Sequence, residues 1–505
     1  MLTAQNFIPI TAEIWLLVAA SVILVWDAIR PNGQRSLWLT QGALFISLGI
    51  NIGYVMAGNT IYAWGGMIVS DPLANFLKAA CTLTVMASLH YAQHYVRDRD
   101  MHQGELYVLA IFALMGQMFM VSAQHMIMMY LGLELMSLSL YALVALRRDH
   151  AASTEAAMKY FVLGALASGF LLYGISMLYG ATGSLDLSTI FKALESGGPA
   201  VNRPTAILAS VFIVAGLAFK FGAVPFHMWV PDVYDGSPTA VTLLVAGAPK
   251  LAALGMALRV MVEGMLPIAA DWQPMFLVLG VASVAVGNVV AVMQTSFKRM
   301  LAYSTISHIG FVVLALAVGV VAKDAVPKDT AINAYGAAVF YMTTYVLTTL
   351  VSFGIILLLA RKGFEADNIA DLKGLSRRSP MLALIMLLTM FSLAGVPPLV
   401  GFWAKLEVIR ALLVANHLVV AVVVVLFSLV GAFYYLRILK TIYFDEPSEP
   451  AQTEEPAESA SNTNATSVTV PKLLLVNGAA LLVLGLLPST LMNASVAVVK
   501  AALST

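Results

Sequence analysis

The chain has 505 residues, of which 60% are hydrophobic and only 11% are charged. Its mean hydropathy of +0.87 lies far above that of soluble globular proteins and predicts an integral membrane protein. The formal net charge of +1 gives no electrostatic support to a nucleic-acid partner. The single cysteine, Cys81, excludes an intramolecular disulfide and a multi-cysteine iron–sulfur or zinc site, and we expect it to pack as a small apolar side chain.

Runs of about 20 apolar residues, the length that crosses a bilayer, predict an all-α polytopic protein with about 14 transmembrane helices. The first seven are expected at 11–29, 37–57, 72–95, 105–122, 125–146, 155–180 and 205–235. The other seven are expected at 238–262, 273–294, 301–322, 332–360, 380–410, 417–442 and 472–496. Residues 445–470 are acidic and rich in Pro, Ser, Thr and Ala, which predicts a disordered linker exposed to solvent.

The seventh predicted helix carries the most informative interruption in the chain. Pro225 lacks an N–H, and its ring clashes with the carbonyl four residues earlier, while Gly222 adds conformational freedom. We therefore expect a broken helix with unpaired carbonyl groups beside the ammonium of Lys220. Such breaks are tolerated inside a bilayer where protein or water covers them, which is where transporters place ion sites. His227 lies inside the same break and is a secondary candidate.

The twelfth predicted helix repeats this pattern around Pro397 and Pro398. Its Ala-Gly-Val-Pro sequence, 394–397, resembles Gly-Ala-Val-Pro at 222–225, with a lysine near each break. Five predicted helices separate the two, and five is an odd number, so the two repeats would be inverted in the membrane. A chance match remains the alternative. The resulting division is a three-helix segment at 1–104, repeats at 105–262 and 273–442, the linker at 445–470 and a last helix at 472–505.

The distribution of lysine and arginine predicts the orientation in the membrane. With the N-terminus outside, sixteen of these residues fall in cytoplasmic loops and seven in loops on the opposite side. This count places Lys298 among the cytoplasmic loop residues and Arg259 among the opposite ones. By the positive-inside rule, both termini are expected outside the cytoplasm.

Two charges in adjacent predicted helices suggest a buried ion pair. Glu134 lies mid-way along the fifth helix, and Lys159 lies near the start of the sixth. A carboxylate in the bilayer is costly, and a neighbouring lysine would offset that cost. The pair would be either a structural ion pair that fixes helix register or an adjustable pair. When an adjustable pair separates, the lysine proton becomes available to a neighbouring group. Asp71, which precedes Pro72 at the entrance of a span, is expected to cap its helix.

Three further lysines, Lys220, Lys250 and Lys405, have no acidic residue within one turn on the same helix face. Burial without an anionic partner disfavours the charged form of a lysine, so these side chains are candidates to load and unload protons. The alternative is that they snorkel to the headgroups, an interpretation that suits Lys78. His308 titrates near neutral pH and is either a relay residue or a hydrogen-bonded core histidine.

Three motifs, 298–310, 225–234 and 395–405, together resemble the antiporter-like subunits of respiratory complex I, the proton-pumping NADH:quinone oxidoreductase. The resemblance extends from about the second to the fourteenth predicted helix. Within that family the chain is most similar to subunit N, because it lacks the long C-terminal lateral helix of subunit L and has Lys405 where subunit M has a glutamate.

The resemblance implies a function in moving protons rather than in redox chemistry. Glu134 and Lys159 would be the family's glutamate–lysine pair, and Lys220 its helix-seven lysine. Lys250, His308 and Lys405 would continue a polar axis along the membrane. Flavin, iron–sulfur clusters and quinone would belong to partner subunits, and the partners would be the other membrane subunits and lipid of a bacterial inner membrane. The alternatives are a subunit of a multisubunit sodium/proton antiporter and a scaffold whose polar axis is vestigial.

Overall fold

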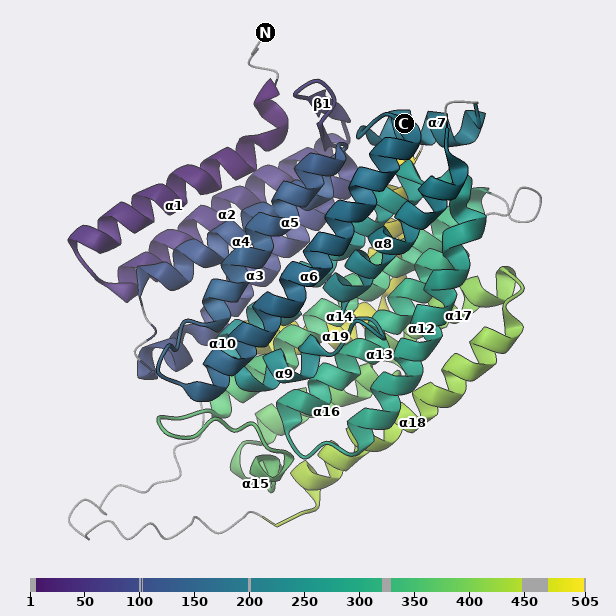
Figure 1. Cartoon of the computed structure of the whole chain (residues 1–505). Coiled ribbons are helices and arrows are strands. Elements are labelled where there is room, and N and C mark those ends of the chain that lie inside the picture. The colour runs from purple at the N-terminus through teal and green to yellow at the C-terminus, as the bar shows by residue number, and fades with distance from the viewer. Residues whose placement is uncertain are drawn as a thin grey trace, which may run out of the picture.

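The computed structural model describes residues 6–99, 101, 103–198, 201–319, 328–446 and 471–503. Figure 1 shows long helices side by side, with α1 at one edge of the bundle and α18 at another. The only strands in these residues are β1 (Ile61–Ala63) and β2 (Ile68–Ser70), which pair antiparallel as a short hairpin. The all-α prediction omits this hairpin, which otherwise leaves the helical class intact.

The first half of the bundle closely follows the predicted spans. Its helices are α1 (Thr11–Ile29), α2 (Gly33–Ala57), α3 (Pro72–Asp98), α4 (Gly104–Ser122), α5 (Met126–Val144), α6 (Ala151–Thr182), α7 (Leu187–Ser196), α8 (Arg203–Phe221), α9 (Trp229–Gly236), α10 (Thr239–Ala246) and α11 (Ala248–Ala257). A π-helical turn, Leu258–Gly264, extends α11. The short amphipathic α7 was not predicted.

The second half begins after this turn. Its helices are α12 (Ala269–Val292), α13 (Phe297–Val318), α14 (Lys328–Leu359), α15 (Leu375–Arg378), α16 (Pro380–Ala394), α17 (Val400–Val414), α18 (Leu418–Tyr443), α19 (Lys472–Leu486) and α20 (Pro488–Leu503). Short 3-10 turns complete the set, at Ile8–Ile10, Leu266–Ile268 and Ile369–Leu372.

Twelve helices of the described residues are long and apolar enough to cross a membrane. The count rises to thirteen if α19 and α20, which are bent by 84° at their junction, form one span. The predicted helix at 380–410 is divided in two, and α16 has only 15 residues. The protein is therefore a polytopic helical membrane protein, and the total of fourteen stays a prediction. Except for Asp445 and Glu446, the predicted linker lies outside the described residues.

Small residues allow the helices to approach closely. A Cβ atom placed on Gly116 of α4 would lie 2.5 Å from the Gly132 carbonyl oxygen of α5. One placed on Gly310 of α13 would lie 2.7 Å from the Gly280 carbonyl oxygen of α12. Such contacts are how helices associate in lipid, where the hydrophobic effect does not drive them together. They bring the backbones of α4 and α5, and of α12 and α13, into direct contact.

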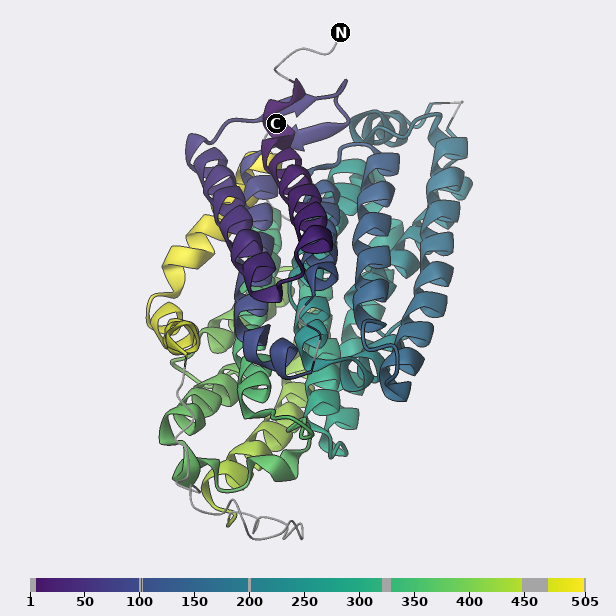
Figure 2. The same ribbon diagram turned by 90° about the vertical axis from the view of Figure 1, so that its left-hand side faces the viewer.

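Figures 1 and 2 show that α1 begins and α20 ends at the same end of the bundle, which also carries the hairpin and α7. The opposite end carries α15 and the junction between α5 and α6.

Two charges that the sequence analysis assigned to loops are instead buried. Arg259 is 1% exposed and Lys298 is 3% exposed, so neither belongs in a count of loop charges.

The interpretation of Lys78 as a snorkelling side chain is wrong. Its side chain is 1% exposed, and its ammonium lies 2.6 Å from a carboxylate oxygen of the equally buried Glu13 in α1. Arg259 is paired in a similar way, because one of its nitrogens contacts both carboxylate oxygens of Asp71 at 2.7 and 2.8 Å. Asp71 also accepts a hydrogen bond from the Ala74 amide at 2.7 Å, which confirms its predicted capping role.

Candidate functional site

Helix α8 ends in the middle of the bundle at a glycine in the left-handed region. Gly222 has a φ of 77°, and its amide donates to the Phe219 carbonyl at 3.0 Å. The next amide, Ala223, donates to the Ala218 carbonyl at 2.8 Å. This pair of bonds is a Schellman motif, which leaves the carbonyl groups of Lys220 and Phe221 to find other donors. The chain resumes helical form only at Trp229.

The ammonium of Lys250 supplies those donors. It lies 2.8 Å from the Phe221 carbonyl oxygen and 3.3 Å from that of Lys220. The side chain is 0% exposed, and its nitrogen lies 4.9 Å from the centre of the Trp229 ring. A cation at a helix C-terminus is stabilised by the helix dipole and by charge-assisted hydrogen bonds. Lys250 on α11 thus caps α8 from the neighbouring span.

Helix α16 ends in the same way, with Lys405 as its cap. Gly395 has a φ of 85°, and the Schellman bonds recur from Gly395 to Ser392 and from Val396 to Phe391. The ammonium of Lys405 lies 2.8 Å from the Leu393 carbonyl oxygen and 3.0 Å from that of Ala394. Both helices therefore end with a left-handed glycine and with two carbonyl groups held by one lysine.

The structure aligns the ends of α8 and α16 one residue away from the alignment of 222–225 with 394–397 made from the sequence. Gly222 corresponds to Gly395 and not to Ala394, so Pro225 corresponds to Pro398 and not to Pro397. The expectation that Lys220 lies against the unpaired carbonyl groups is also wrong, because Lys250 occupies that place. The two capping lysines differ in origin. Lys250 comes from a different span, whereas Lys405 comes from α17, directly after the interruption.

Lys220 is buried and turns instead towards α5. Its ammonium donates to the Ser137 hydroxyl oxygen at 2.8 Å, and its side chain is 8% exposed. Glu134 lies three residues before Ser137 on α5. One carboxylate oxygen of Glu134 is buried without a hydrogen-bond partner. Ser137 was not singled out from the sequence, although its i+3 spacing from Glu134 places both on one helix face.

The predicted pair between Glu134 and Lys159 does not form in this structure. The ammonium of Lys159 lies 2.8 Å from Glu155 on its own helix and 3.0 Å from Asp232 on α9. The other carboxylate oxygen of Asp232 lies 3.0 Å from Arg299. The side chain of Lys159 is 43% exposed, so this cluster opens to the surface of the chain. Asp232 was missed although it belongs to the motif at 225–234.

His308 lies among tyrosines at the centre of the second half. Its Nδ1 and the Tyr341 hydroxyl are 2.7 Å apart, and its Nε2 and the Tyr435 hydroxyl are 3.1 Å apart. Its ring stacks on Tyr345, with ring centres 5.1 Å apart. Both ring nitrogens therefore have partners that can donate or accept, which suits the core and the relay interpretations alike. Neither Tyr341 nor Tyr435 was singled out from the sequence.

The candidate groups form two clusters rather than one continuous chain of hydrogen bonds. Glu134, Lys220 and Lys250 meet around the end of α8, whereas His308 and Lys405 lie around α13 and the end of α16. Helix α14 contacts both α11 and α13 and so lies between the clusters. His227 is half-buried in the turn before α9, and no hydrogen bond joins its side chain to a lysine of either cluster in the described residues. Among those residues, no group of three or more His, Cys, Asp and Glu could hold a metal ion.

The bundle and its internal lysines define a polytopic, antiporter-like membrane protein. Residues 123–431 match the family described as NADH:quinone oxidoreductase/Mrp antiporter, transmembrane. The chain is 54% identical to NADH-quinone oxidoreductase subunit N of Herminiimonas arsenicoxydans and 52% identical to that of Cupriavidus taiwanensis, in both cases over 98% of each chain. The chain therefore belongs to the NADH-quinone oxidoreductase subunit N family, which confirms the resemblance seen in its motifs.

Solved structures agree with this assignment. A chain of respiratory complex I from Thermus thermophilus with bound aureothin is 32% identical, with a TM-score of 0.77 and coverage of 95% of this chain and 98% of that one. A chain of the Mrp complex from Dietzia sp. has a TM-score of 0.81 over 99% of this chain and 97% of that one, but is only 20% identical. The second likeness shows a shared fold alone.

Proposed function

We propose that the chain is the proton-translocating subunit N of an NADH:quinone oxidoreductase and moves charge while partner subunits carry out the redox chemistry. The observation that carries the proposal is the pair of lysine-capped helix ends, because both place an ammonium on carbonyl groups in the interior of the bundle. The partners are the other membrane subunits of the complex, and the membrane is the inner membrane of a bacterium. Flavin, iron–sulfur clusters and quinone belong to those partners.

The proposed pathway starts at Glu134 and Lys220. Movement of the Glu134 carboxylate relative to Lys220 changes how strongly that lysine holds its proton, and Lys250 responds because its ammonium binds the Lys220 carbonyl. His308 then connects the first cluster to Lys405, which releases the proton. Each elementary charge moved against 100 mV costs about 2.3 kcal/mol, so quinone reduction must supply the energy through the conformation of the complex. In this proposal Lys159, which forms an ion pair with Asp232, controls the entry of protons into the pathway.

The proposal extends to the architecture. Helices α8 with α9, and α16 with α17, are each one broken span, and with α19 and α20 as a third interrupted span the chain crosses the membrane fourteen times. The spans between residues 105 and 262 and those between 273 and 442 form two inverted repeats, preceded by a three-helix segment at 1–104. The last span follows the acidic linker at 445–470 and lies within 472–505, and both termini lie outside the cytoplasm. The equivalent caps at Gly222 and Gly395 support the repeat.

Purification of the native complex, followed by reconstitution, tests this function. Flavin-containing, NADH-oxidising subunits should co-purify with the chain, and vesicles should take up protons in proportion to quinone reduced. The variant Glu134→Gln should lower protons taken up per quinone more than it lowers quinone reduction. Purification without such subunits, together with sodium-driven proton exchange, would instead support the sodium/proton antiporter alternative. Unchanged pumping after neutralising Lys220, Lys250 and Lys405 would support the scaffold alternative.

A further inference from the structure

A pocket of about 510 Å³ lies at the end of the bundle opposite the termini, between the end of α3, the start of α4 and the junction of α5 with α6. It is separate from the lysine clusters in the interior. Its lining includes three arginines, two carboxylates and two apolar side chains: Arg99, Arg147, Arg148, Glu105, Asp149, Met101 and Leu146. Because α4, α5 and α6 are long apolar helices, the pocket lies where membrane spans end.

Arg99 and Arg148 have guanidinium nitrogens without a hydrogen-bond partner among the described residues. Arg99 is only 6% exposed, and its Nε and one terminal nitrogen bind Glu365 and two loop carbonyl groups at 3.0–3.1 Å. Its other terminal nitrogen is buried without a hydrogen-bond partner. Arg148 is 81% exposed, and its ion pair with Glu105 is 3.8 Å long, which is too long for a hydrogen bond. A buried unsatisfied guanidinium nitrogen is uncommon and calls for a missing acceptor.

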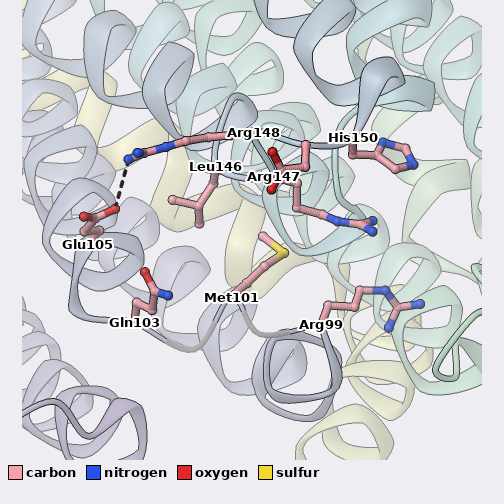
Figure 3. A pocket seen from close by; sticks show the side chains of 9 residues that line it. Arg99, Met101, Gln103, Glu105, Leu146, Arg147, Arg148 and His150 are labelled. Atoms are coloured by element: carbon pink, nitrogen blue, oxygen red, sulfur yellow. Dashed lines mark ion pairs between the residues drawn. The ribbon is translucent and has the colours of Figure 1, made fainter.

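The apolar side chains lie between the charged ones. Figure 3 shows Leu146 and Met101 between the Arg148–Glu105 pair on one side and the guanidinium groups of Arg147 and Arg99 on the other. A purely ionic ligand would gain nothing from this apolar surface. A ligand with phosphate oxygens and a hydrocarbon part would use both the arginines and the apolar surface.

We propose that this pocket binds the phosphodiester of an anionic phospholipid from the adjoining leaflet. Arginine presents planar, paired donors that match phosphate oxygens, and basic pockets between helix ends are suited to acidic headgroups. The three arginines outnumber the two carboxylates of the lining, so a zwitterionic lipid, which brings its own ammonium, would bind less well. Glu105 and Asp149 do not block the site, because both are exposed and can turn to water when the phosphate takes its place beside Arg148.

The test uses the whole purified complex in nanodiscs with a photoactivatable phosphatidylglycerol, labelled in its headgroup, and a matched phosphatidylcholine. Phosphatidylglycerol should label peptides that contain 101–105 or 146–150, and phosphatidylcholine should label them far less. Arg148→Gln should lower that labelling about fivefold, the ratio that about 1 kcal/mol per basic residue gives. The matched control is Arg97→Gln, because Arg97 is 63% exposed near the end of α3 but does not line the pocket.

The comparison of the two lipids on the unaltered complex needs no variant, so a failure of Arg148→Gln to assemble leaves the test intact. Equal labelling by both lipids, or labelling confined to other peptides, would overturn the proposal. Loss of the label in millimolar inorganic phosphate, at constant ionic strength, would show a free-phosphate site and would overturn it as well. None of these outcomes affects the proton-translocating function.

Discussion

The ammonium of Lys250 lies 2.8 Å from the carbonyl oxygen of Phe221, the last residue of α8. Lys405 stands in the same relation to Ala394, the last residue of α16, at 3.0 Å. A neutral lysine would still carry two N–H donors, so loss of its proton would weaken such a cap without removing its hydrogen bonds. What would be lost is the attraction between the positive charge and the helix dipole. The structure therefore links the charge of each lysine to the stability of a helix end.

The first prediction is that the capping lysine stabilises the fold. Lys250→Met should leave the carbonyl groups of Lys220 and Phe221 without donors, at a cost of about 1–3 kcal/mol for each unsatisfied group. The apparent unfolding temperature of the purified complex should fall. Lys440→Met is the control, because that side chain is 70% exposed and should tolerate the change. An equal shift in both variants would contradict the capping role.

The glycines at the two helix ends should resist substitution. Gly222→Ala forces an L-residue into the left-handed region, at about 1–2 kcal/mol, and places its Cβ 2.6 Å from a methyl carbon of Val230. Gly395→Ala meets the same strain and brings its Cβ 3.0 Å from the Lys405 side chain. Thermal unfolding should show both variants to be destabilised.

The control is Gly42→Ala in α2, where an added Cβ meets nothing within 4 Å. A glycine-to-alanine change inside a helix is favourable by about 0.5–1 kcal/mol, so this variant should be unchanged or slightly more stable. If Gly222→Ala behaved like Gly42→Ala, the backbone at the end of α8 would not need a left-handed residue.

The sequence predicted a helical membrane protein with many spans, because apolar run length shows them. The two broken spans, indicated by proline, and the role of the lysines, indicated by isolated charges, stay predictions. The sequence could not predict which carbonyl groups meet which lysine. Lys250 reaches the end of α8 from another span. No residue pattern within one turn of Lys250 or of Phe221 indicates that contact. The pairs of Lys78 with Glu13 and of Arg259 with Asp71 were missed for the same reason, since their members lie far apart in the sequence.

Breaking the buried pair of Lys78 and Glu13 should cost more than removing both charges. Both side chains are 1% exposed, so Lys78→Met alone leaves a buried carboxylate uncompensated, at about 3–5 kcal/mol. The double variant Lys78→Met with Glu13→Gln should recover most of that loss. Thermal unfolding of the two singles and the double forms a mutant cycle. Additive effects would mean that the two charges do not stabilise each other.

The Glu365 carboxylate, in the loop after α14, should make stability depend on acid pH. Burial raises its pKa, but hydrogen bonds from Tyr95 and Arg99 and the charge of Arg99 outweigh burial, so its pKa lies below the usual 4.5. The folded state therefore gains stability above the unfolded pKa and loses it as the pH falls through the lower, folded value. Arg147, 3.4 Å away, belongs to the same contact.

Glu365→Gln tests this dependence. The unaltered protein should be more stable than the variant at neutral pH, and the difference should shrink as the pH falls below about 4.5. Thermal unfolding of the two complexes across that range measures this difference in stability. Subtracting the unfolding temperature of one from that of the other removes the contribution of all other carboxylates. A difference that stays constant with pH would show that the loop is held by contacts other than this charge.

The last prediction separates a proton carrier from a fixed charge at Lys220. Arginine keeps the positive charge and can donate to Ser137, but it does not give up its proton in proteins. If Lys220 loads and unloads a proton, Lys220→Arg should pump as poorly as Lys220→Ala. Glu134→Gln should resemble both because it removes the charge that acts on Lys220, whereas Glu134→Asp should keep part of the activity. The measurement is proton uptake by vesicles, normalised to quinone reduction, with the exposed Lys440→Arg as control. A fully active Lys220→Arg complex would leave Lys220 as a fixed charge and would move the carrier role to Lys250 or Lys405.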